Sequence, residues 1–479
     1  MTTEYLALIR HGSYINGQWH SSDSVFSVLD KATNAQISVV ANAQPAQMCA
    51  AIDAANNALP IWSTHSGAQR SQLLSNWHTL ITEHREALAQ LLTREQGKPL
   101  AEARAEIDYG AGYIKWFAAE AERICGDVME GVNANQSMQV VKKPVGVVGA
   151  ITPWNFPNAM ITRKAAAALA AGCTFVVKPA ADTPLSALAL AALAHQAGIP
   201  QGVLNVVVGT DAQSMGRELT QSPKVAKLSF TGSTKVGQLL IKDCAATVKR
   251  VSMELGGNAP FIVFDDADIE AALEGAMQAK FRNAGQTCVC ANRFLVQAGI
   301  ADAFVAALRD KVATLSQGNG IDNVDLGPLI SQQAAANVHA LVEDAVQKGA
   351  RRHTDTTWNN SAFYPPVILS DISTDMHIMH QEIFGPVVAL STFDTEEQAI
   401  CMANATEYGL AAYFYTRNYA RMQRVANALQ FGMLGMNQAV ISNPAAPFGG
   451  VKHSGYGREG SKYGLDDYLS LQYRCIGTH

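Results

Sequence analysis

The chain has 479 residues, of which 48% are hydrophobic and 16% are charged, and its formal net charge is −5. This hydrophobic content excludes a disordered chain, and the acidic balance offers no basic surface for nucleic acid. The length exceeds that of one ordinary domain, so we expect two or three domains that act on a small metabolite.

The first 151 residues predict strands, then helices, then strands again. Residues 12–40 favour short strands, with Asn16 and Gly17 as a hairpin turn. From residue 44 to about residue 124, apolar side chains at three-to-four spacing predict helices that break at residues 97–99. Residues 138–141 and 145–151 predict two further strands, the first in a protruding hairpin.

The middle of the chain alternates regularly between helical and extended patterns, which predicts a parallel sheet covered by helices on both faces. After a boundary at residues 256–257, a second α/β unit is expected, and residues 449–464 are expected to form a glycine-rich loop before a final strand. The predicted helices are 158–171, 184–197, 212–220, 234–246, 267–281, 301–315 and 331–348, and the predicted strands are 173–178, 203–208, 226–230, 249–253, 260–263, 293–296 and 466–476.

Cysteine usage and hydropathy indicate the compartment. Eight cysteines are scattered without a Cys-x-x-Cys pair or a Cys/His cluster of zinc spacing, so we expect no metal site and a reducing cytoplasm. Residues 1–10 lack the apolar core of a secretory signal. The longest apolar stretch, residues 165–177, is shorter than the ~20 residues that a membrane helix needs. We therefore expect a soluble cytoplasmic protein.

Cys288 is the candidate nucleophile. It lies in a Gly-containing turn, residues 281–290, with Arg, Asn, Gln and Thr around it. A core cysteine normally lies in an apolar run, whereas a reactive one needs a polar, partly open setting that favours its thiolate. The alternative is a small, inert core residue.

Two further residues are candidates for the chemistry around such a nucleophile. Residues 151–157 form a rigid loop with two prolines, which would hold Asn155 as a fixed amide donor for an oxyanion; the alternative is an Asn that satisfies its own turn. Glu254 ends a predicted strand, where a buried carboxylate with a raised pKa acts as a base. An exposed carboxylate is the alternative.

Two predicted strand ends are candidates for cofactor binding. Residues 230–237 lie where a strand passes into a helix, a place where backbone N–H groups attract phosphate. The stretch is neither a P-loop nor the usual G-x-G-x-x-G, so a structural turn is the alternative. Lys178 ends another strand and would meet a ribose or phosphate at the sheet edge, unless it is simply solvated.

Five motifs, taken in order, resemble those of the aldehyde dehydrogenase superfamily, and the resemblance covers essentially the whole chain. It implies an α/β aldehyde dehydrogenase fold with a doubly wound parallel-sheet cofactor domain, an α/β catalytic domain and a small β oligomerisation element. The motifs are residues 153–157 (PWNFP), 230–233 (FTGS), 254–257 (ELGG), 285–288 (GQTC) and 382–386 (EIFGP).

The resemblance also implies how the chain is divided and how it assembles. The dinucleotide-binding domain would comprise residues 1–124 and 144–253, and the catalytic domain residues 254–448. The oligomerisation element would comprise residues 125–143 and 449–479. A homodimer or homotetramer is expected.

The resemblance assigns roles to the candidate residues. Cys288 would attack the aldehyde, Asn155 and the Cys288 backbone N–H would hold the oxyanion, and Glu254 would activate water. Collapse of the thiohemiacetal transfers hydride to the nicotinamide and leaves a thioester. Lys178 and Ser233 would face the cofactor's ribose and phosphates, and Glu382 the nicotinamide ribose. The implied cofactor-binding residues are Thr152, Pro153, Trp154, Lys178, Ala181, Phe230, Thr231, Gly232, Ser233, Leu255, Glu382 and Phe384.

A second set of motifs, at residues 160–164, 280–283, 288–290, 447–450 and 457–464, is most similar to the branch that oxidises succinate semialdehyde, as in 4-aminobutyrate breakdown. Arg163, Arg282 and Ser442 would then bind the distal carboxylate; for each arginine a structural salt bridge is the alternative. Glutarate semialdehyde or another ω-carboxylated aldehyde is the alternative substrate, because one methylene is discriminated by only ~1–3 kcal/mol. A catalytically silent protein on the same fold is the alternative from a different class.

Two positions bear on cofactor choice and regulation. Many NAD-preferring members carry Glu three positions after the lysine, whereas this chain has Ala181. Because no acid repels a 2′-phosphate there, NADP is expected as the preferred cofactor, with NAD usable. Cys290 suggests a reversible disulfide with Cys288 under oxidants, with a packing role as the alternative.

Overall fold

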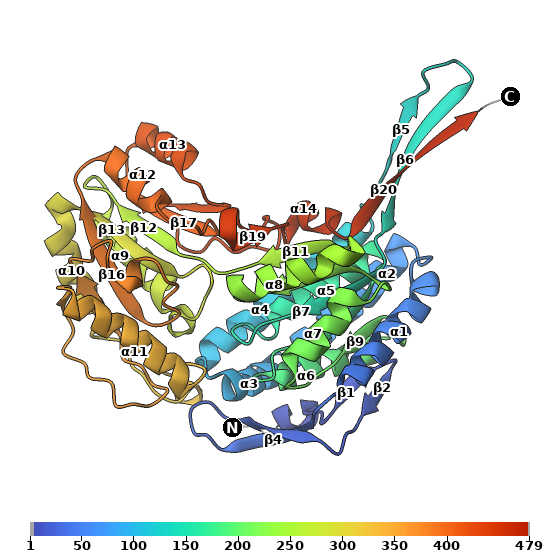
Figure 1. The fold of residues 1–479 in the computed structure, drawn as a ribbon, viewed down its shortest axis with the longest axis horizontal. Coiled ribbons are helices and arrows are strands. Elements are labelled where there is room, and N and C mark those ends of the chain that lie inside the picture. The colour runs from blue at the N-terminus through green and yellow to red at the C-terminus, as the bar shows by residue number, and fades with distance from the viewer. Residues whose placement is uncertain (1–3, 478–479) are drawn as a thin grey trace.

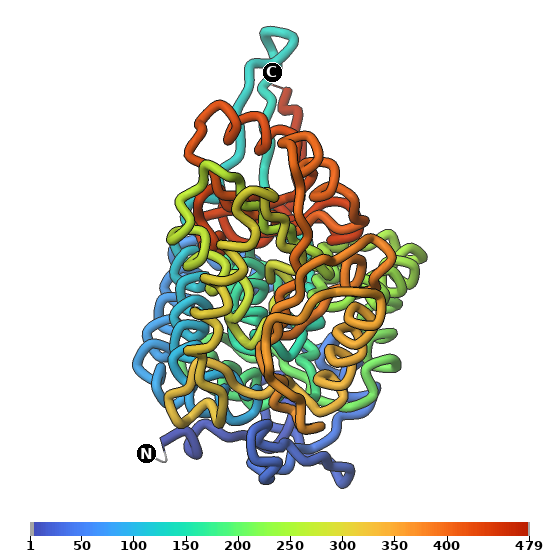
Figure 2. Tube along the Cα trace, turned by 90° about the vertical axis from the view of Figure 1, so that its left-hand side faces the viewer, coloured from blue at the N-terminus to red at the C-terminus, as the bar shows by residue number. Residues whose placement is uncertain are grey.

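The computed structural model describes residues 4–477; the outermost residues of the predicted segments 1–124 and 449–479 lie outside this range. Two α/β bodies, one built on an eight-stranded and one on a seven-stranded sheet, lie side by side, and a narrow three-stranded sheet projects beyond them (Figure 1). The view from the side shows this projection at one end of the molecule, beside the C-terminus (Figure 2). The α/β fold agrees with the prediction.

The N-terminal strands confirm the predicted hairpin. β1 (Ser13–Ile15) and β2 (Gln18–His20) pair antiparallel, and Asn16 and Gly17 between them have φ values of 50° and 78°. Asn and Gly adopt this left-handed conformation at little cost, as a two-residue hairpin requires. A short 3-10 helix (Glu4–Leu8) precedes them, and β3 (Val25–Leu29) and β4 (Gln36–Ala41) form a separate two-stranded sheet.

The helical region from residue 44 is also confirmed. Gly97, with a φ of 102°, ends one helix, and Pro99 immediately precedes the next. Within residues 4–477 no helix is long and apolar enough to cross a membrane. The helices are α1 (Pro45–Trp62), α2 (Gly67–Glu83), α3 (Arg85–Gln96) and α4 (Leu100–Ala121).

The eight-stranded sheet has the order β19-β11-β10-β7-β8-β9-β1-β2, with five parallel strands flanked by antiparallel edges. α5 and α6 pack with α2, α3 and α4, while α1, α7 and α8 form a second layer, so helices cover both faces as predicted. Observed bounds differ from predicted ones by one or two residues: β7 (Val147–Ile151), α5 (Ala159–Ala171), β8 (Thr174–Lys178), α6 (Pro184–Gln196), β9 (Leu204–Val206), α7 (Ala212–Gln221), β10 (Val225–Thr231), α8 (Thr234–Cys244) and β11 (Arg250–Glu254).

The seven-stranded sheet has the order β14-β15-β16-β13-β12-β17-β18. The sequence pattern predicts β12, β13, α9, α10 and α11, but no element between residues 349 and 448. The missed strands are short and mostly buried, so they lack the polar alternation that marks a half-exposed strand. The elements are β12 (Ala259–Val263), α9 (Ile269–Phe281), β13 (Ala291–Gln297), α10 (Ala298–Val312), α11 (Gln332–Gln347), β14 (Arg351–Arg352), β15 (Val367–Ser370), β16 (Val387–Phe393), α12 (Glu396–Asn404), β17 (Ala411–Tyr415), α13 (Tyr419–Ala428) and β18 (Met433–Met436).

The projecting sheet, which we call the arm, consists of β5 (Asp127–Glu130), β6 (Gln136–Pro144) and β20 (Leu469–Gly477). β20 pairs antiparallel with β6 along its whole length, so the C-terminal strand lies beside residues far away in the sequence. The predicted hairpin and final strand are both confirmed.

The prediction that residues 449–464 form a loop is wrong in part. It contains β19 (Gly455–Tyr456) and the start of α14 (Ser461–Asp466); β19 pairs with β11, and α14 packs on α4 and α5. A Cβ atom at Gly455 would lie 1.9 Å from the Met253 carbonyl oxygen. Glycine is therefore present because the backbone closely approaches the eight-stranded sheet, not because the segment is a free loop.

The carboxyl ends of the parallel strands form one edge of the eight-stranded sheet. Ile151 is in register with Lys178 and with Phe230, and Thr231 with Glu254. The segments that follow these strands therefore meet at one place. In the second body, the turn at residues 282–290 connects α9 to β13 at this junction, which positions the candidate site.

Candidate active site

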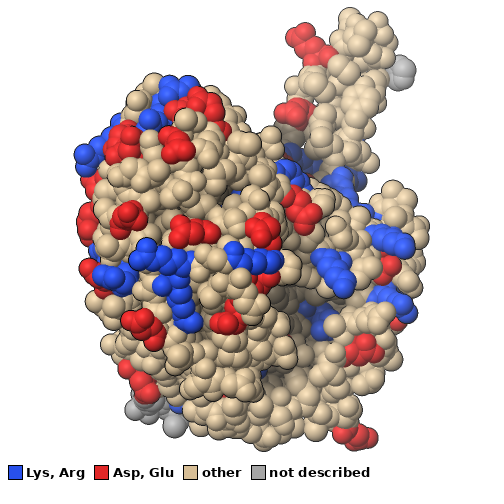
Figure 3. All heavy atoms as spheres, turned by 60° about the vertical axis from the view of Figure 1, so that its left-hand side comes forward, with Lys and Arg blue, Asp and Glu red and all other residues tan. Residues whose placement is uncertain are grey.

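A cavity of about 390 Å³ lies at this junction and contains all three candidate catalytic residues, Cys288, Asn155 and Glu254. The molecular surface is visibly hollowed, with charged side chains around the rim of the depression (Figure 3). Except for Gly256, the other lining residues were also predicted: Pro153, Trp154, Thr231, Gly232, Ser233, Leu255, Glu382 and Phe384.

The turn before Cys288 is unusual in its backbone. Asn283, Ala284 and Gly285 all have positive φ values, of 53°, 53° and 78°. A Cβ at Gly285 would lie 2.2 Å from the carbonyl oxygen of Gly385, so only glycine fits there without displacing the backbone. This compact turn leaves Cys288 half-buried at the cavity wall, between the buried Thr287 and Val289.

The protonation of Cys288 corrects one expectation. Burial raises the pKa of its thiol to about 12; Glu382 and Glu254 add to this effect, while Arg163 and Arg282 oppose it. The polar residues of the turn therefore do not make the resting thiol acidic, because loss of solvation outweighs them. Cys288 needs a base to become a nucleophile.

Asn155 is held across the junction between the two bodies. Its side-chain amide donates to the backbone carbonyl of Gln286 at 3.1 Å, so it does not serve its own turn. Its backbone carbonyl accepts from Lys98 Nζ at 2.8 Å and from Asn283 Nδ2 at 3.0 Å. An amide nitrogen has a second hydrogen, which remains for an oxyanion.

Glu254 is buried, so the alternative of an exposed carboxylate does not apply. Neither carboxylate oxygen has a hydrogen-bond partner among residues 4–477. Burial raises the pKa of Glu254 well above its usual range, and the negative charge of Glu459 raises it further, whereas Arg163 and Lys164 act in the opposite direction. A carboxylate in this state readily takes up a proton.

Glu459 was not predicted as a site residue, although it lies within the motif at residues 457–464. It forms buried ion pairs with both Arg163 and Lys164. The structural salt bridge that was the alternative for Arg163 is therefore present. The Arg163 guanidinium also packs over Phe448 at 4.5 Å, and its Nη2 has no hydrogen-bond partner in the described chain. Its contact with substrate stays a prediction.

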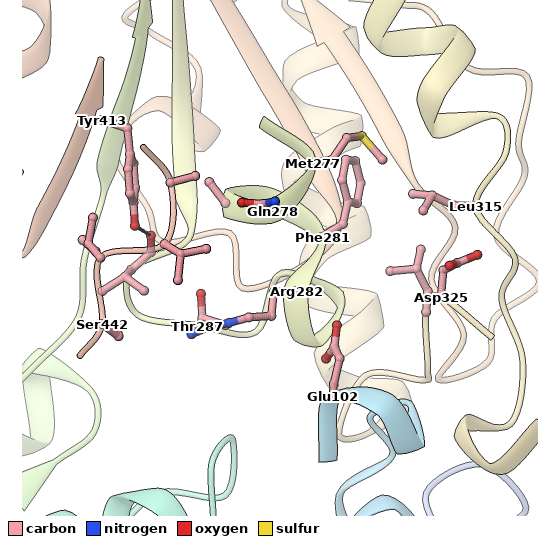
Figure 4. Close-up of a pocket in the computed structure, with 16 residues that line it drawn as sticks. Glu102, Met277, Gln278, Phe281, Arg282, Thr287, Leu315, Asp325, Tyr413 and Ser442 are labelled. Atoms are coloured by element: carbon pink, nitrogen blue, oxygen red, sulfur yellow. Dashed lines mark hydrogen bonds between the residues drawn. The ribbon is translucent and has the colours of Figure 1, made fainter. Parts of the chain in front are cut away.

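Arg282 differs from Arg163 because it is exposed and forms no ion pair or hydrogen bond among residues 4–477. Its guanidinium lies 5.1 Å from the centre of the Phe156 ring. A small cavity of about 20 Å³ brings Arg163, Arg282 and Ser442 together beside Cys288. Arg282 and Ser442 also line an outer cavity of about 360 Å³, where the Arg282 side chain extends toward Thr287 (Figure 4).

The remaining predicted cofactor residues lie around the larger cavity or behind it. Glu382 accepts from the Gly257 N–H at 3.2 Å, and burial raises its pKa to about 8. Ser233 caps α8 by accepting from Val236 N–H. Phe384 packs edge-on against Trp154, whereas Phe230 is buried in the core and does not line the cavity.

Several buried polar groups near the site have no hydrogen-bond partner in residues 4–477. They show whether the site suits a dinucleotide, because a bound ligand would have to supply the missing partners. Thr152 Oγ1 and Thr231 Oγ1 have no hydrogen-bond partner in residues 4–477. Lys178 is buried, forms no ion pair within the same range, and has a pKa lowered by burial to about 8. Hydroxyl and phosphate groups of a dinucleotide would satisfy such groups, so the residues present fit that cofactor. Ala181 lies half-buried in the turn after Lys178.

Cys290 is buried, and its thiol donates weakly to the carbonyl oxygens of Lys280 and Ala291 at 3.6 Å each. These contacts suit the packing alternative, and the disulfide with Cys288 stays a prediction. No group of three or more His, Cys, Asp or Glu side chains that would hold a metal occurs in the described part of the chain.

The chain is similar to known proteins over nearly its whole length. The succinate-semialdehyde dehydrogenase (NADP+) of Escherichia coli strain K12 is 52% identical over 475 residues, covering 98% of each chain. The glutarate-semialdehyde dehydrogenase of Pseudomonas putida strain KT2440 is 52% identical over 474 residues, again with 98% of each covered. A crystal structure described as an E. coli NADP-dependent enzyme matches with a TM-score of 0.97 and 51% identity, covering 98% of this chain and 99% of that one. The model of the aldehyde dehydrogenase family matches residues 19–473, and the chain belongs to this family.

Proposed function

We propose that this enzyme oxidises succinate semialdehyde to succinate, with NADP as the preferred cofactor and NAD as a usable one. The observation that carries the proposal is the position of Cys288. It lines both the cavity that contains Asn155 and Glu254 and the small cavity that contains the unpaired cation Arg282. The nucleophile thus stands between a catalytic side and a carboxylate-binding side.

The residues of the chain account for each proton and charge in this reaction. Glu254 takes the proton of the Cys288 thiol, directly or through a water molecule, and the thiolate attacks the aldehyde carbon. The oxyanion of the thiohemiacetal accepts hydrogen bonds from the Asn155 amide and the Cys288 N–H. The bound cofactor supplies the acceptor for the hydride that leaves this carbon. Glu254 releases the thiol proton to solvent, takes a proton from the water that hydrolyses the Cys288 thioester, and returns it to the Cys288 thiolate as succinate leaves.

The cofactor would be held by residues at the ends of the parallel strands and around the larger cavity. Lys178 and Ser233 would bind its ribose and phosphates, and Glu382 the nicotinamide ribose. NADP is favoured because position 181 itself, occupied by Ala181, carries no carboxylate that would repel a 2′-phosphate, although Asp182 and Asp211 lie near enough to act on Lys178. The likeness to the E. coli enzyme named for NADP+ supports the same choice.

Arg282 supports a substrate with a distal carboxylate. Its guanidinium forms no ion pair among residues 4–477, although Glu102 lines the same outer cavity, and charge-assisted hydrogen bonds are each worth ~1.5–3 kcal/mol. Ser442, and the free Nη2 of Arg163, would complete the carboxylate site. Glutarate semialdehyde is the second candidate, because the outer cavity leaves room beyond Arg282 and a relative of equal identity is named for that substrate.

We also propose the domain division given above, with the eight-stranded body as the cofactor domain, the seven-stranded body as the catalytic domain and the arm as the oligomerisation element. Exposed apolar side chains on the arm support a homodimer or homotetramer: Val128, Leu471 and Tyr473 are 77%, 70% and 58% exposed. A cytoplasmic location is supported by the eight cysteines, all of which are free.

Initial rates test the proposed substrate and cofactor. With succinate semialdehyde and glutarate semialdehyde, kcat/KM is expected to exceed that of a neutral aldehyde of similar length at least ~10-fold, because only the carboxylated substrates pair with Arg282. NADP is expected to support higher kcat/KM than NAD. Arg282→Met should remove the advantage of the carboxylated substrates, whereas Arg309→Met, at an exposed arginine on α10, should not. Equal rates for the neutral aldehyde in the unmodified enzyme would refute the carboxylate site.

Cofactor choice is tested at Ala181. Ala181→Glu is expected to lower the ratio of kcat/KM for NADP to that for NAD at least ~10-fold, because a carboxylate there repels the 2′-phosphate and can bind the ribose hydroxyls. Ala181→Gln, which has the same size without the charge, is the matched control and should change the ratio far less. If both variants shift it equally, bulk rather than charge at this position governs the choice.

The pH dependence of Cys288 alkylation tests the state of its thiol. In enzyme without added cofactor, the rate constant for iodoacetamide is expected to rise ~10-fold per pH unit from about pH 7 to about pH 10, because the thiolate fraction rises this way below a pKa of about 12. The Glu254→Gln variant shows whether the Glu254 carboxylate contributes to the pH dependence of alkylation. The rate constant of this variant should rise with the same slope. The site of modification is located by mass spectrometry. A rate constant that stops rising above about pH 8.5, the ordinary pKa of a thiol, would contradict the account.

A further inference from the structure

A buried network of polar side chains lies directly behind Asn155, and none of its members was assigned a role by the motifs. Its centre is Lys98, in the short connection between α3 and α4, which is only 2% exposed. Lys98 Nζ donates to the Asn155 backbone carbonyl at 2.8 Å and to Glu106 Oε2 at 2.6 Å. It also lies 3.9 Å from the centre of the Phe156 ring. Lys98 therefore contacts the oxyanion loop at two consecutive residues.

Glu106 connects the same ion pair to the far end of that loop. Its second carboxylate oxygen accepts from the backbone N–H groups of Asn158 and Ala159, at 2.9 and 3.2 Å. These residues begin α5, where free N–H groups and the helix dipole favour a carboxylate. The Lys98–Glu106 pair thus fixes the loop on both sides of Phe156.

A second branch of the network binds the turn that carries Cys288. Gln96 donates to Asn283 Oδ1 at 3.1 Å, and Glu102 accepts from the Asn283 N–H at 2.8 Å. Oriented in this way, Asn283 Nδ2 donates to the carbonyls of Asn155 and Gln286, at 3.0 and 3.2 Å. Figure 4 shows Glu102 reaching from its helix toward this turn. One segment, residues 96–106, therefore holds both the oxyanion loop and the nucleophile turn.

Stability alone is a poor explanation for this arrangement. A buried ion pair gives little net stability, because desolvation offsets most of the attraction between the charges. Burial lowers the pKa of Lys98, which reflects this cost, while the attraction to Glu106 opposes the shift. The pair instead fixes the orientation of the loop backbone, because each of its charges forms hydrogen bonds to backbone atoms of the loop. A small displacement of an oxyanion donor has a large effect on rate.

We propose that Lys98, held by Glu106, is a positioning residue for catalysis: it fixes the Asn155 peptide so that the Asn155 amide stays directed at the oxyanion formed on Cys288. The proposal rests on the proposed function, in which Asn155 stabilises that oxyanion. Lys98 itself touches neither of the cavities beside Cys288.

The test is Lys98→Met, which keeps the length of the side chain and removes its charge and donors. The single-turnover rate of NADPH formation with succinate semialdehyde is expected to fall ~10- to 100-fold, with KM values for aldehyde and NADP within ~3-fold of the unmodified enzyme. Alkylation of Cys288 by iodoacetamide, which forms no oxyanion, should keep its rate. The control is Lys249→Met, the same substitution at a lysine far from the site. Lys249 donates to the backbone carbonyls of Leu219 and Ser222, so this variant also removes lysine hydrogen bonds to the backbone. It should leave the turnover rate unchanged.

A double-mutant cycle shows whether Lys98 acts through Asn155. In an Asn155→Ala background, Lys98→Met should cause no further loss of rate, because the donor that it positions is already absent. Losses that multiply, or a loss of Cys288 alkylation equal to the loss of turnover, would overturn the proposal. Failure of the proposed function has a different signature: the unmodified enzyme would form no NADPH from the semialdehyde, or Asn155→Ala would retain its full rate.

Two further variants protect the test against misfolding. Lys98→Met leaves the Glu106 carboxylate buried without its cation, so Lys98→Met with Glu106→Gln removes that cost. Asn283→Gly keeps the positive φ of 53° accessible and removes the second donor to the Asn155 carbonyl. Each should lower the single-turnover rate of NADPH formation as Lys98→Met does. Neither should lower that rate further in the Asn155→Ala background. Folded variants with unchanged rates would overturn the proposal.

Discussion

The hydrogen bond from the Asn155 amide to the Gln286 carbonyl, at 3.1 Å, helps to join the two halves of the active site. Asn155 follows β7 of the eight-stranded sheet, and Gln286 precedes β13 of the seven-stranded sheet. The nucleophile and its oxyanion donor therefore come from different bodies, and their relative position depends on contacts across the junction. The network centred on Lys98 and Asn283 lies around this bond, which explains why so many polar groups are buried there.

Burial also determines the chemistry of the resting site. It raises the pKa values of the Cys288 thiol and of the Glu254 carboxyl, so both groups prefer their neutral forms before substrate arrives. A neutral thiol is poorly reactive, and a carboxylate without hydrogen-bond partners is a strong proton acceptor once it is ionised. The low solvation that makes Cys288 inert by itself thus makes Glu254 an effective base beside it.

The two arginines show how position gives similar residues different roles. Arg163 is buried and shares Glu459 with Lys164, so most of its charge is compensated within the protein. Arg282 follows a helix at the edge of the outer cavity and forms no ion pair in the described chain, although Glu102 lines the same cavity. The unpaired charge of Arg282 is therefore the stronger attraction for a substrate carboxylate, while Arg163 adds a single free nitrogen.

Much of the fold and of the site was predictable from local patterns. The alternation of helices and strands predicted a parallel sheet, and residues at the ends of its strands, such as Lys178 and Glu254, then had to meet at one edge. Motif order located Cys288 and Asn155. The pairing of Lys164 with Glu459 was not predictable in this way, because 295 positions separate the two residues in the sequence and only tertiary packing brings them together.

Other failures have equally specific causes. Gly97, Lys98 and Pro99 predicted the end of a helix, which is correct, but the sequence did not show that Lys98 reaches Asn155, 57 positions away. The segment that contains Gly455 was interpreted as a loop, whereas Gly455 permits close backbone contact with β11. The polar turn around Cys288 predicted an acidic thiol, because the sequence does not reveal how strongly the folded chain excludes water from it.

The central claim is that Cys288 carries the acyl group between oxidation and hydrolysis, with Glu254 as the base for the second step. The most direct measurement is mass spectrometry of the unmodified enzyme, quenched in acid within its first turnover with succinate semialdehyde and NADP. The account predicts a succinyl group on the peptide that contains Cys288, formed together with NADPH and absent from a Cys288→Ser variant. NADPH formation without this adduct, or an adduct on another residue, would contradict it.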